Sequence, residues 1–341
     1  MTTDTPAPTI KEVAAYAGVA LSSVSRVLNK HPDVSTAMRS RVLESVEALG
    51  YEPNLLAAGL RSGSTRTIGF IVSDISNPLF AEITLGASRR LEEAGYTMVL
   101  TNSEGDPQRD GEMIRLLRWR QVDGFIVSVA DESRKSTIEE LKRVDTPVVL
   151  LDREIPELNM AAAVLTDHRS GMNDATEHLV GLGHRRIALI SGPLVTRPGR
   201  ERLEGFRAVF RAHDIPQPEY LIRSGPMNAE FGEAMTHEVL DDPNPPTAIL
   251  CGGNLTLIGV LRALKSRSLS VGSDVALISC DDVPLAELHV PPVSVIARDT
   301  VALGELAAEV MLQRMTAEVQ TAQVEIVPTH LILRSSTFKA S

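Results

Sequence analysis

The chain has few of the features that mark secreted or membrane proteins. Its 341 residues include two cysteines, Cys251 and Cys280, which are too few for a disulfide framework. No apolar run reaches the roughly 18 residues of a membrane span. The N-terminal residues MTTDTPAPT lack the charged and apolar regions of a secretory signal. We therefore expect a protein of the cytoplasm.

Sequence motifs of common enzymes are missing as well. The chain contains no G-x-x-x-x-G-K-[ST], G-x-G-x-x-G or G-x-S-x-G, so a phosphate loop, a dinucleotide fingerprint and a nucleophile elbow are not predicted. His178 and His184 lack the spacing or the cysteine partner of a metal site. Cys251 and Cys280 end two predicted strands, and without a flanking cation neither is expected to be reactive. We predict no cofactor.

What the chain does contain begins with residues 9–29, TIKEVAAYAGVALSSVSRVLN, which have the pattern of two short helices joined by a turn at Gly18. Thr9 and Glu12 form the S/T-x-x-E capping box of a helix start. Apolar residues recur at helical spacing in both segments: Ile10, Val13, Ala14 and Ala17 in the first, Ala20, Val24, Val27 and Leu28 in the second. The pattern predicts a helix-turn-helix whose second helix reads the major groove. A plain helical hairpin is the alternative.

The residues that follow add a third helix and the segment Leu49-Gly50-Tyr51-Glu52-Pro53-Asn54. With them the chain resembles the lactose/galactose repressor family of bacterial transcription regulators, whose headpiece follows AxxAGVSxxTVSRVLN, VSxxTRxxV and LGYxPN. The resemblance implies a DNA-binding set consisting of Leu21, Ser22, Ser25, Arg26, Asn29, His31, Asn54 and Leu60. In the family, a hinge helix inserts a leucine into the minor groove, and here that position is Leu60. Gly59 inside this segment costs about 1 kcal/mol of helix stability relative to alanine.

The charge distribution is consistent with a specific DNA contact. The chain has 34 Lys/Arg and 44 Asp/Glu, a formal net charge of −10. Residues 1–66 carry +1 and the remaining 275 carry −11. Indiscriminate nucleic-acid binding needs many local cations, so this distribution favours contacts through one small surface.

From residue 67 onward, apolar strands alternate with longer amphipathic stretches, which predicts βαβ units and a mostly parallel sheet. We expect strands at 68–72, 97–100, 124–127, 148–151, 163–165, 187–190, 248–251, 275–279 and 293–296. Such a length favours two similar lobes with a ligand at the carboxyl ends of the strands. The resemblance likewise implies a periplasmic-binding-protein-like core. Its three crossings between lobes would fall near residues 166–167, 297–298 and 328–329.

The resemblance also implies an effector site. Asp74 and Phe80 follow the first core strand, Arg202 falls where the family keeps an effector-binding arginine, and Asp281 matches its carboxylate partner. A guanidinium and a carboxylate across a cleft suit vicinal hydroxyls or an anionic group. An alternative is that Arg202 and Asp281 form a structural salt bridge. Where the family has A-N-D this chain has Gly252-Gly253-Asn254, so we assign the polar amide to Asn254.

We therefore predict an α/β protein with a small all-α helix-turn-helix headpiece and a two-lobed α/β core with mostly parallel sheets. Its segments would be a disordered tail (1–8), the headpiece (9–52), a hinge helix and linker (53–66) and an effector-binding and dimerisation domain (67–341). The function would be that of a ligand-responsive repressor, which binds a palindromic double-stranded DNA operator as a homodimer and acts at the nucleoid. The alternatives are a binding protein without a regulatory role and a sugar-handling enzyme.

Overall fold

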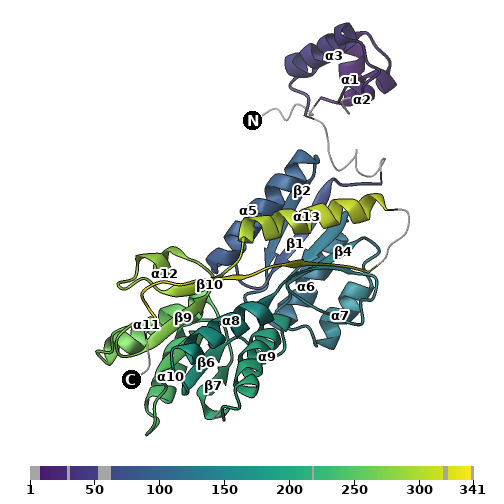
Figure 1. The fold of residues 1–341 in the computed structure, drawn as a ribbon. Helices are drawn as coiled ribbons and strands as arrows, with labels where there is room; N and C mark the ends of the chain where they lie inside the picture. Colours follow the sequence, from purple (N-terminus) through teal and green to yellow (C-terminus); the bar gives the residue numbers. More distant parts are fainter. Residues whose placement is uncertain (1–7, 29–30, 53–62, 217–218, 318–321, 339–341) are drawn as a thin grey trace, which may run out of the picture. The chain divides into compact units, whose positions relative to one another are not determined.

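The structure, a computed structural model, describes residues 8–28, 31–52, 63–216, 219–317 and 322–338. The chain divides into two compact units, residues 1–65 and residues 66–341. Figure 1 shows the first as a cluster of helices and the second as two sheets covered by helices. Asn29, Asn54, Gly59 and Leu60 lie outside the described residues.

The first unit contains α1 (Ile10–Ala17), α2 (Leu21–Leu28) and α3 (Thr36–Leu49). The predicted capping box is present, with Thr9 accepting from Glu12 N and donating its own N–H to the Glu12 carboxylate. Gly18 ends α1 with φ of 62°, a left-handed conformation that glycine adopts without strain. One expectation was wrong: Ala20 is exposed and its carbonyl accepts from Val24 N at the start of α2, while Val19 packs on the apolar core.

The second unit begins with a lobe whose sheet has the strand order β11-β5-β4-β3-β1-β2; we call it lobe 1. Its strands are β1 (Thr67–Val72), β2 (Thr97–Asn102), β3 (Gly124–Val127), β4 (Val148–Leu151), β5 (Ala162–Thr166) and β11 (Gln323–Val327). Its helices are α5 (Pro78–Glu93), α6 (Pro107–Trp119), α7 (Lys135–Lys142) and α13 (Thr300–Thr316). Helices α5 and α13 pack so closely at Gly304 that an added Cβ there would lie only 1.9 Å from the Ile83 carbonyl oxygen.

Lobe 2 has the strand order β12-β10-β9-β8-β6-β7. Its strands are β6 (Ile187–Ser191), β7 (Ile222–Ser224), β8 (Ala248–Cys251), β9 (Ala276–Cys280), β10 (Ser294–Ala297) and β12 (His330–Ile332). Its helices are α8 (His168–Gly181), α9 (Arg197–Ala212), α10 (Ala229–Leu240), α11 (Asn254–Ser266) and the short α12 (Pro284–Leu288), with a 3-10 turn η1 (Glu219–Leu221). No helix among the residues that the structure describes combines the length and apolar character needed to cross a membrane.

The predicted fold class is confirmed. Among the described strands, every pairing is parallel except that of β10 with β12. The chain passes between the lobes after β5, after β10 and after β11, which agrees with the three expected crossings. All nine expected strands are present within two residues of their predicted ends, and β7, β11 and β12 were missed. Because the strands are parallel, their carboxyl ends gather at the cleft between the two lobes.

Candidate functional site

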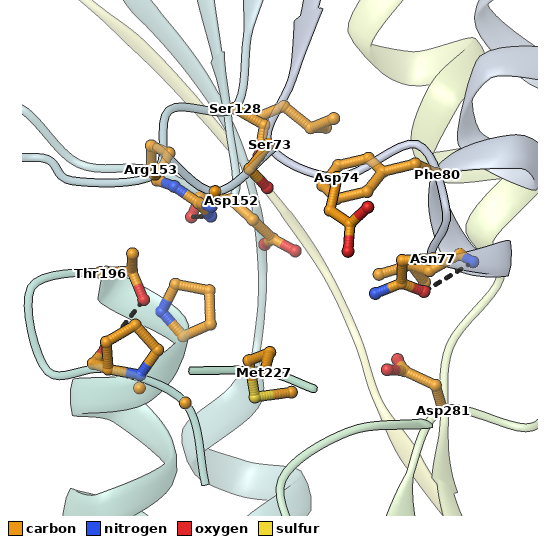
Figure 2. A pocket seen from close by; sticks show the side chains of 18 of the residues that line it. Ser73, Asp74, Asn77, Phe80, Ser128, Asp152, Arg153, Thr196, Met227 and Asp281 are labelled. Atoms are coloured by element: carbon orange, nitrogen blue, oxygen red, sulfur yellow. Dashed lines mark hydrogen bonds between the residues drawn. The ribbon is translucent and has the colours of Figure 1, made fainter. Parts of the chain in front are cut away.

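A cavity of about 320 Å³ lies between the lobes, within the size range of small-molecule sites. Four of the five predicted effector residues line it: Asp74, Phe80, Arg202 and Asp281. Figure 2 shows Asp74 and Phe80 on one side of the cavity, and Met227 and Asp281 on the other. The fifth, Asn254, is not among the lining residues; it is buried at the start of α11 and donates to Asn77, which does line the cavity.

The best-connected group in the cavity is Arg298, which follows β10 and has a nearly buried side chain. Its Nη1 donates to Asp152 Oδ2 at 2.7 Å, and its Nη2 lies 3.3 Å from Asp281 Oδ1. Asp152 follows β4 in lobe 1 and Asp281 follows β9 in lobe 2. One guanidinium therefore binds a carboxylate from each lobe.

The surroundings of Asp152 keep its carboxylate ionised. Burial alone would raise its pKa, but Arg298, His168 and a hydrogen bond of 2.6 Å from Thr166 N hold that pKa well below the usual range. His168 Nε2 lies 3.4 Å from Asp152 Oδ2. Burial, reinforced by Arg202, lowers the pKa of His168 to about 3. His168 is therefore neutral at pH 7, and the charge partner of Asp152 is Arg298.

Two other buried arginines line the cavity, and they differ in their partners. Arg153 donates to the backbone carbonyls of Val129 and Asp152. Arg202, on α9, is 6% exposed, and its Nε has no hydrogen-bond partner among the described residues. The salt bridge between Arg202 and Asp281 that we considered is not formed, since the ion pair of Asp281 is with Arg298.

Two further sets of bonds join the lobes at the cleft. Glu132, in the loop between β3 and α7, accepts from Arg197 N at 2.6 Å and from Arg200 Nη2 at 2.7 Å at the start of α9. Asn254 Nδ2 donates to Asn77 Oδ1 at 2.8 Å. Glu132 is buried although both of its partners come from the other lobe. These bonds connect the two lobes across the cleft.

The departures seen in the sequence around Gly252 and Gly253 have a packing explanation. A Cβ at Gly253 would lie 2.1 Å from Met227 Cε, and one at Gly252 would lie 2.3 Å from Ser191 Oγ. A larger residue at Gly253 would displace Met227, which lines the cavity, and one at Gly252 would collide with Ser191. Cys251 and Cys280 belong to apolar clusters on different faces of the sheet. Burial raises the pKa of Cys251 to about 12, which disfavours the reactive thiolate.

Sequence reasoning did not name Asp152, His168, Arg298, Asn77 or Glu132 as site residues. Asp152 and Arg298 lie at the carboxyl ends of predicted strands. Their position could have predicted a place in the site, because the carboxyl ends of parallel strands face the ligand cleft. Nothing local in the sequence predicts the role of Glu132, because its partners come from the other lobe.

In the first unit, the predicted DNA-binding side chains lie mostly on the exposed face of α2. Leu21, Ser22 and Arg26 are exposed and Ser25 is half-buried. Arg26 Nη2 lies 3.4 Å from Asp33 Oδ2 and 3.3 Å from His31 Nδ1. Arg26 and His31 are therefore neighbours.

Comparison with known proteins shows which protein family this chain belongs to. The family profile described as bacterial regulatory proteins, lacI family, matches residues 9–54, and a periplasmic binding protein-like domain matches residues 176–337. The ribose operon repressor of Escherichia coli (strain K12) is 34% identical over 94% of this chain and 97% of its own length. The chain belongs to the lacI family. The HTH-type transcriptional regulator DegA of Bacillus subtilis (strain 168) is also similar, at 30% identity over 96% of this chain and 98% of its own length.

Solved structures agree with membership of the lacI family. The lac repressor dimer bound to operator and an anti-inducer is 27% identical over 98% of this chain and its whole length, with a TM-score of 0.84. A LacI family regulator from Enterococcus faecium with bound ribose is 28% identical over 81% of this chain and its whole length, with a TM-score of 0.70. The chain is thus a DNA-binding transcription regulator. The enzyme alternative is set aside because the matched relatives are regulators.

Proposed function

We propose that this lacI family member is a repressor that binds a near-palindromic DNA operator as a homodimer and responds to a small polar metabolite in the cavity between its lobes. The observation that carries the proposal is that cavity, in which charged side chains from both lobes meet. A ligand shifts a conformational equilibrium only through its different affinities for the two arrangements, so contacts from both lobes are what a regulatory ligand needs.

The DNA contacts are proposed for the exposed face of α2. Leu21 and Ser22 would select bases, and Arg26 would bind guanine through its paired donors. Ser25, Asn29, His31 and Asn54 would complete this surface and Leu60 would enter the minor groove. The exposure of Leu21, Ser22 and Arg26 supports the proposal, while Asn29, Asn54 and Leu60 lie outside the described residues.

The effector would be a small sugar-like molecule. The relatives include a repressor named for the ribose operon and a regulator that holds ribose, and the cavity has room for a molecule of that size. Phe80 offers an apolar wall to the ligand, and Asp74, Arg202 and Asp281 offer polar groups. Asn254 would act indirectly, because its side-chain amide donates to Asn77, which lines the cavity.

The proposed homodimer is supported by an apolar surface on lobe 2. Leu288 and Val290 are 77% and 89% exposed, and Val290 lines a groove together with Leu261 and Leu285. Contiguous exposed apolar surface is typical of a protein interface. The lac repressor structure, whose fold this chain shares, is that of a dimer.

The decisive experiment is a genome-wide selection of DNA fragments bound by the purified full chain. We expect the fragments to share a near-palindrome with half-sites about one helical turn apart. Genes beside those fragments would then supply candidate effectors for release assays. Fragments without a common sequence would contradict operator binding, and a protein that binds D-ribose but no DNA would favour the alternative of a binding protein without a regulatory role. We further propose that the protein acts at the nucleoid in the cytoplasm, which imaging of a fluorescent fusion would test.

A further inference from the structure

The first residue of the second unit, Arg66, has an unfavourable backbone conformation. Its φ is 50°, in the left-handed region that glycine adopts easily and that residues with a side chain adopt rarely. Such a conformation costs free energy and persists only where the surroundings hold it. Arg66 does not line the cavity and is not one of the predicted DNA contacts, so neither proposed binding site explains why it is held in this way.

Contacts with two neighbouring segments hold Arg66 in this conformation. Its N–H donates to Asp123 Oδ2 at 2.9 Å, and its carbonyl accepts from Thr97 N at 2.8 Å. Its guanidinium lies over the ring of Tyr96, with Cζ 5.1 Å from the ring centroid, which is a cation–π distance. Arg66 is exposed, so specific contacts and not burial fix its position.

These contacts connect Arg66 to the three strands that carry the lobe 1 wall of the cavity. Strand β1 follows Arg66 directly, Tyr96 precedes β2, and Asp123 precedes β3. The three strands are parallel, and β1 pairs with both of the others. At the carboxyl end of each strand the chain reaches residues that line the cavity: Ser73 and Asp74 after β1, Glu104 and Gly105 after β2, and Ser128 after β3. Arg66 is therefore fixed at one end of a sheet whose other end forms part of the cavity.

The loops at the cavity end of these strands are joined to one another as well. Asn102, the last residue of β2, accepts through its Oδ1 from Ile75 N and from Glu104 N, each at 3.2 Å. Ile75 belongs to the loop after β1, so one side-chain oxygen connects the loops that follow two strands. A displacement of these loops would act on both strands together, because packed protein interiors transmit strain.

We infer that Arg66 is a positioning residue, which fixes the place and the direction in which the chain connects lobe 1 to the DNA-binding unit. The inference rests on the proposed function and deepens it. In a homodimer, two DNA-binding units must reach two half-sites at a set spacing, so freedom at the connection of each unit to its lobe lowers operator affinity. The stack of Arg66 on Tyr96 removes that freedom at the residue where lobe 1 begins.

The first experiment measures how strictly the protein requires the spacing of its operator. Anisotropy titrations of the full chain would use the operator from the genome-wide selection and a version with two base pairs inserted at its centre. The insertion separates and rotates the half-sites, so the wild-type protein should lose affinity for it. Arg66→Gly should bind the original operator about tenfold more weakly and lose less affinity on insertion, because a looser connection is less well placed and more adaptable.

A matched control separates positioning from backbone conformation. Asp214→Gly makes the same kind of exchange at another exposed residue, whose φ is 52° in the turn after α9. It should keep both the operator affinity and the spacing requirement. Glycine adopts this conformation without strain, which offsets its greater freedom in the unfolded chain, so Arg66→Gly should change the melting temperature by no more than about 2 °C.

Variants of Tyr96 test the stack itself. Tyr96→Phe keeps the aromatic ring and should bind both DNAs as the wild-type protein does, whereas Tyr96→Leu should resemble Arg66→Gly. The stack can also be measured without DNA, because trypsin cleaves after arginine and the side chain of Arg66 must leave Tyr96 to enter the protease. Mass spectrometry of brief digests should show cleavage after Arg66 roughly fivefold faster in Tyr96→Leu, as the loss of an exposed cation–π contact allows, and unchanged in Tyr96→Phe.

Three results would overturn the inference and leave the repressor proposal intact. One is an Arg66→Gly variant that keeps the operator affinity and the spacing requirement of the wild-type protein. Another is a loss of affinity with a matching fall in melting temperature, since Arg66 would then only stabilise lobe 1. The third is equal tryptic cleavage after Arg66 in the wild-type protein and in Tyr96→Leu. A wild-type protein that binds no shared DNA sequence would instead reject the proposed function, and the inference with it.

Discussion

Replacing Arg298 by methionine tests whether one side chain holds both lobes at the cleft. Methionine has a similar length and no charge, so Asp152 and Asp281 would keep their burial and lose their cation. Removing one partner of a buried ion pair typically costs 3 to 5 kcal/mol, since the remaining charge is uncompensated. Two carboxylates are affected here, so we expect a loss of about 4 kcal/mol in the free energy of unfolding at pH 7.5.

The stability lost in Arg298→Met should also depend on pH. Because the folded-state pKa of Asp152 is lowered, its ionised form stabilises the native protein above the unfolded pKa of 3.8, and that stability is lost as the pH falls through the folded value. The lowered pKa of His168 likewise stabilises the native state above pH 6.5, and this contribution is lost between 6.5 and about 3. In Arg298→Met, proton uptake by His168 would relieve the unpaired charge of Asp152, whose Oδ2 lies 3.4 Å from His168 Nε2. The deficit of the variant should therefore shrink as the pH falls from 7.5 to 5.5.

Urea denaturation followed by circular dichroism at both pH values would measure these differences. The matched control is Arg211→Met, which breaks an exposed ion pair with Glu204 and should cost no more than about 1 kcal/mol at either pH. A deficit for Arg298→Met equal to that of the control, or one that does not change with pH, would refute the assignment of Arg298 as the shared cation of the cavity.

Three further substitutions test other parts of the protein. Arg26→Ala should weaken binding to the selected operator by about 1 to 3 kcal/mol and spare random DNA, as an anisotropy titration on both DNAs would measure; equal losses would make Arg26 a phosphate contact. Glu132→Gln should lower the free energy of unfolding of the ligand-free protein by about 1 to 3 kcal/mol, since it weakens charge-assisted bonds between the lobes, and an unchanged urea midpoint would count against that role. Leu288→Asp should dissociate the homodimer in sedimentation velocity runs, while Val324→Asp, at another exposed apolar position, should not; a dimer that survives Leu288→Asp would require a different interface.

Local signals in the sequence were sufficient for the headpiece and for the central strands. The Thr9 capping box, the Gly18 turn and the apolar spacing of α1 each depend on residues a few positions apart. These features could therefore be predicted from one or two helical turns of sequence. Central parallel strands are buried on both faces and appear as continuous apolar runs, as Val148–Leu151 and Ala248–Cys251 do. The position of Ala20 was predicted wrongly because residues at the turn do not follow helical spacing.

Edge strands and contacts between the lobes were beyond local signals. Strands β7 and β12 are short edge strands, and β11 alternates half-buried with exposed residues, so none has the apolar run of a central strand. The same limit applies to the cavity. Sequence reasoning assigned Asp281 to a ligand, but its ion pair with Arg298 arises from the crossing after β10 and the closure of two lobes whose residues are far apart in the chain.

The bonds across the cleft also limit how a ligand can regulate this protein. Arg298, Glu132 and Asn254 bind groups of the opposite lobe. A molecule that enters the cavity therefore acts by adding to these bonds or by competing with them. A ligand that contacts residues of both lobes adds a connection without breaking the pairs of Arg298, so it would stabilise the arrangement with the lobes closed. If the closed arrangement has a different affinity for the operator, then operator DNA must change the affinity of the ligand by the same factor. Titrating the ligand with and without operator would measure that factor directly, and a factor of one would mean that the cavity has no part in regulating DNA binding.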